Sequence, residues 1–187
     1  MRHALMLVAC FSCGAALAAE PPGPSNSVAA PPESQTPVGA TANLAPTQGN
    51  SVSGLLSLNT DKSGVRVAGT IAGLTPNAEQ GFHIHEKGDC SAPDASSAGG
   101  HFNPGKQPHG NPNARGPRHL GDMVNVRADA KGNARVDAFI DGATLHTGQP
   151  NDVAGKAIVV HQKADDYASQ PSGNSGDRVA CGVISAR

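Results

Sequence analysis

The chain has 187 residues and a formal net charge of −1, so its charge gives no support for nucleic-acid binding, which is typical of strongly basic domains. Its length fits one ordinary domain with an additional segment. The 23 Gly and 15 Pro residues, with an aromatic content of only 3 %, favour many turns between short strands over long helices.

The N-terminal residues 1–19 have the three parts of a secretory signal: a basic start, an apolar run, and small residues over 15–19. The apolar run is too short for a transmembrane helix, which needs roughly 20 apolar residues. We therefore expect export to the periplasm and removal of this segment. Because residues 7–10 also resemble a lipoprotein cleavage box, a lipid anchor at Cys10 or Cys13 is the less favoured alternative.

The next segment, residues 20–39, is rich in Pro and has almost no large apolar side chain. Such a composition cannot build a core and predicts a flexible tether, which leaves residues 40–187 as the folded domain. After removal of the signal, this domain keeps two cysteines, Cys90 and Cys181. In an oxidising compartment two cysteines most simply pair, and two buried free thiols are the alternative.

Within residues 40–187 the pattern is one of short strands. Alternating or short apolar segments lie at residues 40–44, 52–58, 65–71, 80–86, 123–128, 134–139, 156–161 and 179–186. No amphipathic helix of useful length separates them. These eight segments predict an all-β fold, an antiparallel sandwich or barrel.

Two connections are long for a compact domain: residues 87–121 and residues 162–177. Loops beyond about 12–15 residues without secondary structure are uncommon and are usually functional or disordered. The first of them carries a cluster of histidines, so a bound metal could supply the contacts that order it.

Two of the histidines, His83 and His85, lie in a predicted strand, where residues i and i+2 share a face. His161, at the end of another strand, could supply a third nitrogen. A nitrogen-only set of this kind suits copper. His146 is interpreted as a surface residue.

A second set follows in the first long loop, formed by His101, His109, His119 and Asp122. Three nitrogens and one carboxylate oxygen make a closed tetrahedral set, as expected for structural zinc.

Five segments together carry a resemblance to a known family: GFHIHEKGDC, GGHFNPGKQPHG, RHLGDMVNV, HQKADDY and GNSGDRVACGV. They are similar to the copper–zinc superoxide dismutases, in particular the exported bacterial ones, over roughly residues 40–187. The resemblance implies a Greek-key arrangement of the strands and one copper and one zinc per subunit. It also implies the substrate, superoxide, and a role in antioxidant defence in the cell envelope.

The resemblance further implies how the residues divide between the metals. Copper falls to His83, His85, His101 and His161, and zinc to His101, His109, His119 and Asp122. His101 would bridge both ions.

Other residues also match positions of the family. Arg178 matches its active-site arginine, and Cys90 with Cys181 match its disulfide. Asp165 falls where the family joins a copper ligand to a zinc ligand, with Asp166 as the neighbouring alternative.

The cleft lining that attracts the anionic substrate could include Lys87, Lys106 or Lys163, and the sequence favours none of them. The protein could be a monomer or a homodimer.

A metal carrier on the same fold and a zinc hydrolase are the competing functions. The complete ligand sets argue against both, because a hydrolase needs an open zinc position.

Overall fold

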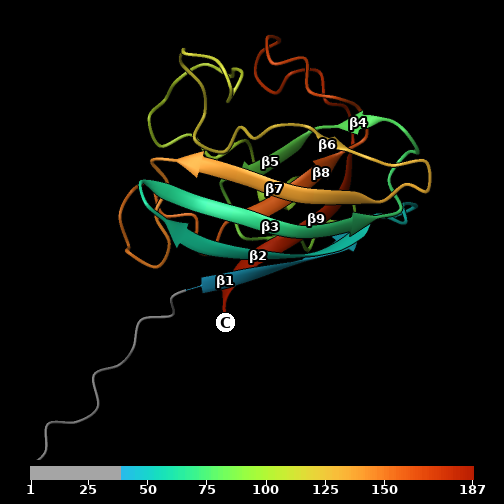
Figure 1. Cartoon of the computed structure of the whole chain (residues 1–187), viewed down its shortest axis with the longest axis horizontal. Helices are drawn as coiled ribbons and strands as arrows, with labels where there is room; N and C mark the ends of the chain where they lie inside the picture. Colours follow the sequence, from blue (N-terminus) through green and yellow to red (C-terminus); the bar gives the residue numbers. More distant parts are fainter. Residues whose placement is uncertain (1–38) are drawn as a thin grey trace, which may run out of the picture. The chain divides into compact units, whose positions relative to one another are not determined.

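The computed structural model describes residues 39–187 (Figure 1). The predicted signal, residues 1–19, lies outside the described residues, as does the predicted tether up to residue 38. Gly39 is already the first residue of a strand. Among the described residues, no helix is long and apolar enough to cross a membrane.

The described chain contains strands and one short 3-10 helix. In order they are β1 (Gly39–Pro46), β2 (Ser53–Asp61), β3 (Gly64–Ala72), β4 (Glu79–Gln80), β5 (Phe82–His85), η1 (Ser96–Ala98), β6 (Val126–Arg127), β7 (Ala134–Asp141), β8 (Ala157–His161) and β9 (Arg178–Ala186). The predicted all-β class is therefore confirmed.

Seven strands form one antiparallel sheet in the order β5-β8-β9-β1-β2-β3-β7, and β4 pairs with β6. β3 pairs with β7, and β1 pairs with β9, so neighbouring strands of the sheet are not always neighbours in sequence. The chain crosses from one end of the strand order to the other between β3 and β5, and again between β7 and β8. These crossovers are Greek-key connections of the predicted kind. The sheet curls so that its inner face encloses the core (Figure 1).

Alternation of side chains explains which face is buried. Along β7 every second residue is buried, from Ala134 to Ile140, and the residues between them are exposed. Strands β2 and β3 both extend beyond the expected segments, residues 52–58 and 65–71. Their hairpin turn is therefore tighter than expected and consists of Lys62 and Ser63. Lys62 adopts φ 46°, a left-handed conformation that suits a two-residue hairpin.

The expected strand over residues 80–86 is divided in the structure, which is why nine strands are described instead of eight. Gly81 separates β4 from β5, and its N–H donates to the carbonyl of Lys163 at 2.8 Å, while the N–H of His161 donates to the carbonyl of Gly81 at 2.8 Å. A Cβ at Gly81 would lie 2.8 Å from Cβ of Ser175. This close approach needs glycine, and it joins the strand to the second long loop.

The disulfide joins Cys90 and Cys181, as predicted, with 5.8 Å between their Cα atoms. It ties the first long loop to β9 above a small apolar cluster that includes Ala157 and Val159. The bridge spans 91 positions of sequence, for which loop-closure entropy gives a stabilisation of about 4–5 kcal/mol. Parts of both long loops lie at the same end of the molecule, above β5 and β8 in Figure 1.

Candidate metal centre

Strand β5 presents two histidines beneath the long loops. Phe82 and Ile84 are fully buried in the main core, so the alternating His83 and His85 point to the other side of the strand. These two rings are also buried, at 0 % and 1 % exposure. A hydrophobic side chain on one face and a covered imidazole on the other is the local pattern that the sequence GFHIHE encodes.

The end of β8 and the start of β9 each bring one more residue to the same place. Phe82 pairs with Val160, so His161 lies one position beyond β5. Between β8 and β9 the register shifts, because Val160 pairs with Ala180 whereas His161 pairs with Arg178. A bulge of this kind re-aims side chains. Here it sets Arg178 opposite His161.

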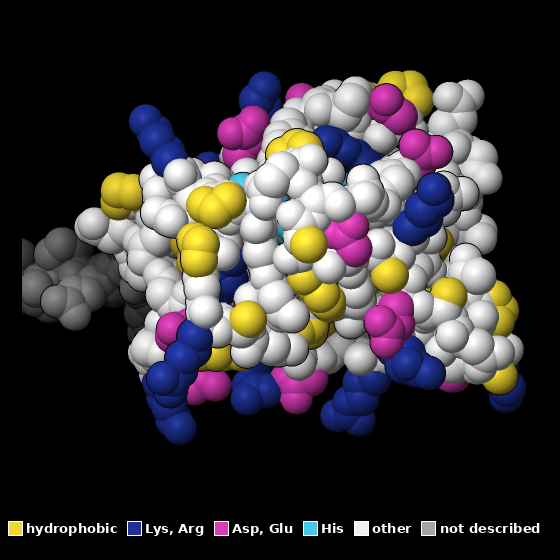
Figure 2. All heavy atoms as spheres, turned by 90° about the horizontal axis from the view of Figure 1, so that it is seen from above, with side chains coloured by type: hydrophobic (Ala, Val, Ile, Leu, Met, Phe, Trp, Pro, Cys, Tyr) yellow, Lys and Arg dark blue, Asp and Glu magenta, His cyan; other side chains and the backbone are white. Residues whose placement is uncertain are grey.

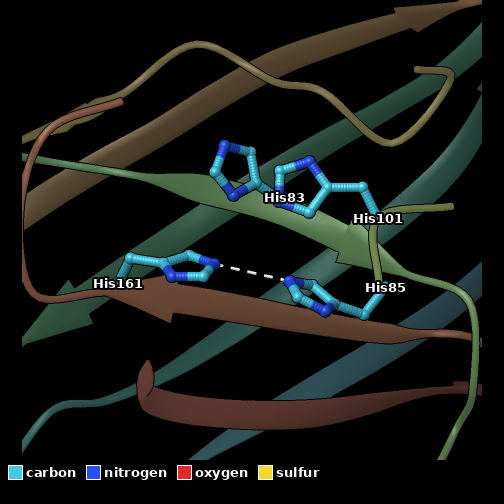
Figure 3. Close-up of side chains that lie close together, drawn as sticks. All are labelled: His83, His85, His101 and His161. Carbon is cyan, nitrogen blue, oxygen red and sulfur yellow. Dashed lines mark hydrogen bonds between the residues drawn. The ribbon is translucent and has the colours of Figure 1, made fainter. Parts of the chain in front are cut away.

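His83, His85, His101 and His161 form the first group of potential ligands (Figure 3). Each offers a ring nitrogen within 4.8 Å of the others, and all four are buried. The ring centroids of His83 and His101 are 4.0 Å apart, and Nε2 of His85 lies 3.4 Å from Nε2 of His161. Four imidazole nitrogens so close together suit copper.

The second group shares His101 with the first and adds His109, His119 and Asp122. Oδ1 of Asp122 lies 2.8, 3.0 and 3.2 Å from Nδ1 of His101, His109 and His119. Its Oδ2 accepts hydrogen bonds from the N–H groups of Gly110 and His119, which fixes the carboxylate. Three nitrogens and one oxygen fit tetrahedral zinc.

Four ring nitrogens of these groups are fully buried without a hydrogen-bond partner: Nδ1 of His83, Nε2 of His101, Nδ1 of His109 and Nδ1 of His119. For His109 and His119 the contact with Asp122 is short but not aligned as a hydrogen bond. A buried nitrogen without a partner is costly. The four nitrogens without a partner lie in groups whose ligand atoms are within 4.8 Å of one another, as the ligands of a metal ion do. The residues therefore fit both metals.

The carboxylate of Asp165 joins the two groups from outside. Its Oδ2 lies 2.8 Å from Nε2 of His83, and its Oδ1 lies 2.9 Å from Nε2 of His109. Burial would raise the pKa of Asp165, but the contacts with His109 and His83 hold it well below its usual range. Although burial lowers the pKa of His109, the carboxylates of Asp122 and Asp165 raise it to about 9.

Backbone carbonyls orient the remaining rings. Nδ1 of His85 donates to the carbonyl of Gly99 at 2.9 Å, and Nδ1 of His161 donates to that of Gly176 at 3.2 Å. Burial, with the nearby His83, lowers the pKa of His161 to about 3, and burial lowers that of His101 to about 4. These rings are therefore neutral at neutral pH, as metal binding requires.

Arg178 lies beside this first group on a fixed frame. Its Nη1 donates to the carbonyl of Ala95 and its Nη2 to that of Gly99, both at 2.6 Å. Because Gly99 also accepts from His85, one carbonyl holds the guanidinium next to a potential copper ligand. Burial lowers the pKa of Arg178 while the nearby Asp94 raises it, and a guanidinium keeps its charge at any physiological pH.

Comparison with known proteins decides the family. The family model described as copper/zinc superoxide dismutase matches residues 52–184, which include every residue of both groups. The chain belongs to the copper/zinc superoxide dismutase family. It is an oxidoreductase that dismutates superoxide, and copper and zinc are its cofactors.

Similar proteins come from bacteria. A copper–zinc superoxide dismutase of Aquifex aeolicus is 47 % identical over 148 residues, which cover 78 % of this chain and 85 % of the relative. The superoxide dismutase-like protein YojM of Bacillus subtilis is 35 % identical and covers 98 % of this chain and 96 % of its own. A crystal structure of a superoxide dismutase-like protein from Bacillus subtilis superposes with a TM-score of 0.70 at 37 % identity, covering 77 % of this chain and 97 % of its own.

The structure brings together all seven residues that the sequence assigned to the two metals. Asp165 lies between the groups, whereas Asp166 is exposed and accepts hydrogen bonds from the N–H groups of Ala168 and Ser169. His146 belongs to neither group, and it is half-buried instead of lying freely on the surface.

The face at the loop end of this superoxide dismutase is shown in Figure 2. Histidine appears there only in small areas between other side chains, because the loops cover the metal-ligand groups. Lys87, Lys106 and Lys163 are all exposed, and the stem of Lys163 lies over Gly176. Exposure does not separate the three as candidates for attracting the anion.

Sequence reasoning missed the carbonyl groups that orient the rings and the guanidinium, those of Ala95, Gly99 and Gly176. Every residue has a carbonyl, so a sequence pattern gives no signal for the ones that turn toward a site. The one hint is the pair Gly99-Gly100 before His101. Gly99 adopts φ 75°, a conformation that glycine permits.

Proposed function

We propose that copper is bound by His83, His85, His101 and His161, and zinc by His101, His109, His119 and Asp122. The observation that carries this division is the position of His101, which is a member of both groups. Its Nδ1 lies 2.8 Å from Asp122, while Nε2 of the same ring is buried without a partner. One imidazole can therefore serve both ions, each through a different nitrogen.

Copper, when bound, supplies the one-electron chemistry of the reaction, whereas zinc has no redox activity. The residues of the chain supply a proton and a place for the anion. Nε2 of His101 is the atom at which we place one of the two protons that hydrogen peroxide needs: it would take this proton from solvent in one half-reaction and pass it to the reduced substrate in the other, and the second proton would come from solvent. Nδ1 of the same ring lies 2.8 Å from Asp122 in the second group, so zinc bound by these two residues would hold the ring from its other side.

Arg178 holds the superoxide anion beside His85 and His161. Its two hydrogen bonds to loop carbonyls leave the guanidinium fixed and half-buried, so little side-chain freedom is lost on binding the substrate. A lysine would bring the same charge without this planar, doubly anchored group.

We also propose that residues 1–19 are a signal peptide, residues 20–38 a tether and residues 39–187, which begin with β1, the enzyme domain, and that the protein acts in the periplasm against superoxide. The disulfide between Cys90 and Cys181 supports this location, because such bonds persist in oxidising compartments. A lipid anchor at Cys10 or Cys13 is the alternative form of export. Either a monomer or a homodimer is compatible with this function.

A superoxide-removal assay with and without cyanide, run beside metal analysis, tests the assignment. The expected result is about one copper and one zinc per chain and activity that cyanide abolishes, because cyanide is a ligand of copper and copper is the redox centre. Zinc alone after copper has been supplied would overturn the division of ligands. Both metals without turnover would favour a metal carrier.

A further inference from the structure

Two side-chain amides hold the peptide groups of residues at the metal centre. Oδ1 of Asn125 accepts the N–H of Asp165 at 2.9 Å, and its Nδ2 donates to the carbonyl of Asp165 at 2.9 Å. In the same manner Oε1 of Gln170 accepts the N–H of His109 at 2.8 Å, and its Nε2 donates to the carbonyl of His109 at 2.9 Å. Each amide therefore fixes both ends of one residue.

Tyr167 completes the arrangement around Asp165. Its hydroxyl oxygen accepts the N–H of Asn125 at 2.8 Å, and its own N–H donates to Oδ1 of Asp165 at 2.6 Å. The backbone of Tyr167 adopts φ 59°, which is uncommon for a tyrosine. Tyr167, Asn125 and Asp165 thus form a closed ring of hydrogen bonds between the second long loop and the segment before β6.

The ring matters because of what Asp165 contacts. Its two oxygens reach His83, a member of the first group only, and His109, a member of the second group only. A small displacement of Asp165 would turn one imidazole in each group. Partners that orient metal-binding histidines are commonly worth about 10- to 100-fold in metal affinity.

We propose that Asn125, Tyr167 and Gln170 are positioning residues of the metal centre, with Asn125 and Tyr167 acting through Asp165 and Gln170 acting through His109. None of the three is a member of either ligand group. This inference rests on the ligand assignment proposed above.

The two routes lead to different results for the two metals. Asn125 and Tyr167 hold a carboxylate that contacts both groups, so their loss disturbs copper and zinc together. Among the members of the two groups, Gln170 holds only His109, and its other hydrogen bond reaches the carbonyl of Ala168, so its loss disturbs zinc and leaves the copper ligands as they are. A merely structural contribution to the loop would not distinguish the metals in this way.

The test uses the full chain with three substitutions. Tyr167→Phe removes the hydroxyl that accepts the N–H of Asn125, and Gln170→Met removes both polar atoms of the amide at nearly constant length. Ser169→Ala is the matched control, because its hydroxyl, in the same loop, donates to the exposed Asp166 and not toward the metal centre. Zinc affinity is measured by competition with a chelator, and the copper site by its visible and electron paramagnetic resonance spectra.

We expect Tyr167→Phe to lower zinc affinity about three- to tenfold, less than the loss of a direct partner, and also to shift the copper spectra. Gln170→Met should lower zinc affinity by a similar factor while the copper spectra of the zinc-loaded protein stay unchanged. Ser169→Ala should change neither. Circular dichroism of each metal-free variant shows whether the fold is retained.

The positioning role is overturned if both variants match Ser169→Ala in metal affinity and spectra, or if they lower only the unfolding temperature. It is also overturned if Gln170→Met and Tyr167→Phe affect the two metals alike. A wild-type chain that fails to take up one copper and one zinc would instead contradict the ligand assignment, so the two failures are distinguishable.

Discussion

Nδ1 of His101 lies 2.8 Å from Oδ1 of Asp122, and the opposite nitrogen of the same ring, Nε2, is buried without a hydrogen-bond partner. The first contact places the ring in the zinc group. His101 is also a member of the first group, in which it and three further imidazoles each offer a nitrogen within 4.8 Å of the others. Burial keeps the ring neutral between them, because it lowers the pKa of His101 to about 4.

His101→Ala should therefore remove the ligand that the two metals share. With cobalt in the zinc site, the magnetic coupling between copper and cobalt should disappear, because the shared ring that carries it is gone. Turnover should fall by about two orders of magnitude or more, the usual scale for loss of a general acid. His146→Ala is the control, since His146 lies outside both groups. Coupling that survives in His101→Ala would contradict the bridge.

Arg178→Ala should slow the association of superoxide. The guanidinium is a fixed charge at the substrate position, so its removal should lower the second-order rate about tenfold and flatten its dependence on ionic strength. Arg178→Lys should keep part of the salt dependence, because the charge remains, but should not restore the rate. Arg135→Ala, which removes an exposed charge from β7, is the matched control. A salt profile identical to that of the wild type would exclude this role for Arg178.

Asp165→Asn and Asp166→Asn together distinguish the roles of two neighbouring carboxylates in zinc binding. Asp165 contacts His83 and His109, so its neutral variant should lose about 10- to 100-fold in zinc affinity. Asp166 is exposed and holds only turns of its own loop, so its variant should retain the metal. Chelator competition measures both. Equal losses in the two variants would mean that the charge of the loop, and not the contacts of Asp165, retains zinc.

The local chemistry of the centre could be predicted where it depends on short-range pattern. His83 and His85 share a face because a strand has a period of two, and Phe82 and Ile84 identify the opposite face as core. The zinc ligands could be found from the choice of residue types and from the resemblance, although their spacing of eight, ten and three follows no helix or strand period.

What could not be predicted depends on contacts between distant parts of the chain. The break at Gly81 exists because its backbone pairs with residues 161 and 163. Asn125 and Gln170 are two among many polar residues in loops, and nothing in the sequence separates them from Asn111 or Gln107. Only the fold shows which amide meets the peptide of a site residue.

Asp152 offers a prediction away from the metals. Its carboxylate accepts hydrogen bonds from the N–H groups of four residues of the turn before β8, namely His146, Thr147, Gly148 and Ala154. Burial would raise its pKa, but these bonds lower it below the ordinary value of 3.8. The stability that they contribute is therefore fully present above about pH 4 and is lost as the pH falls through the lowered pKa of the folded state.

Asp152→Asn should thus lower the free energy of unfolding at neutral pH by about 1 kcal/mol, a modest figure because the side chain is partly exposed and its charge is screened. The difference from the wild type should shrink as both proteins are acidified below pH 4, since the wild-type carboxylate then becomes neutral as well. Denaturant unfolding at a series of pH values measures it, with Asp141→Asn as a control that lies on the exposed end of β7. A difference that stays constant across this range would show that the carboxylate acts through its shape and not through its charge.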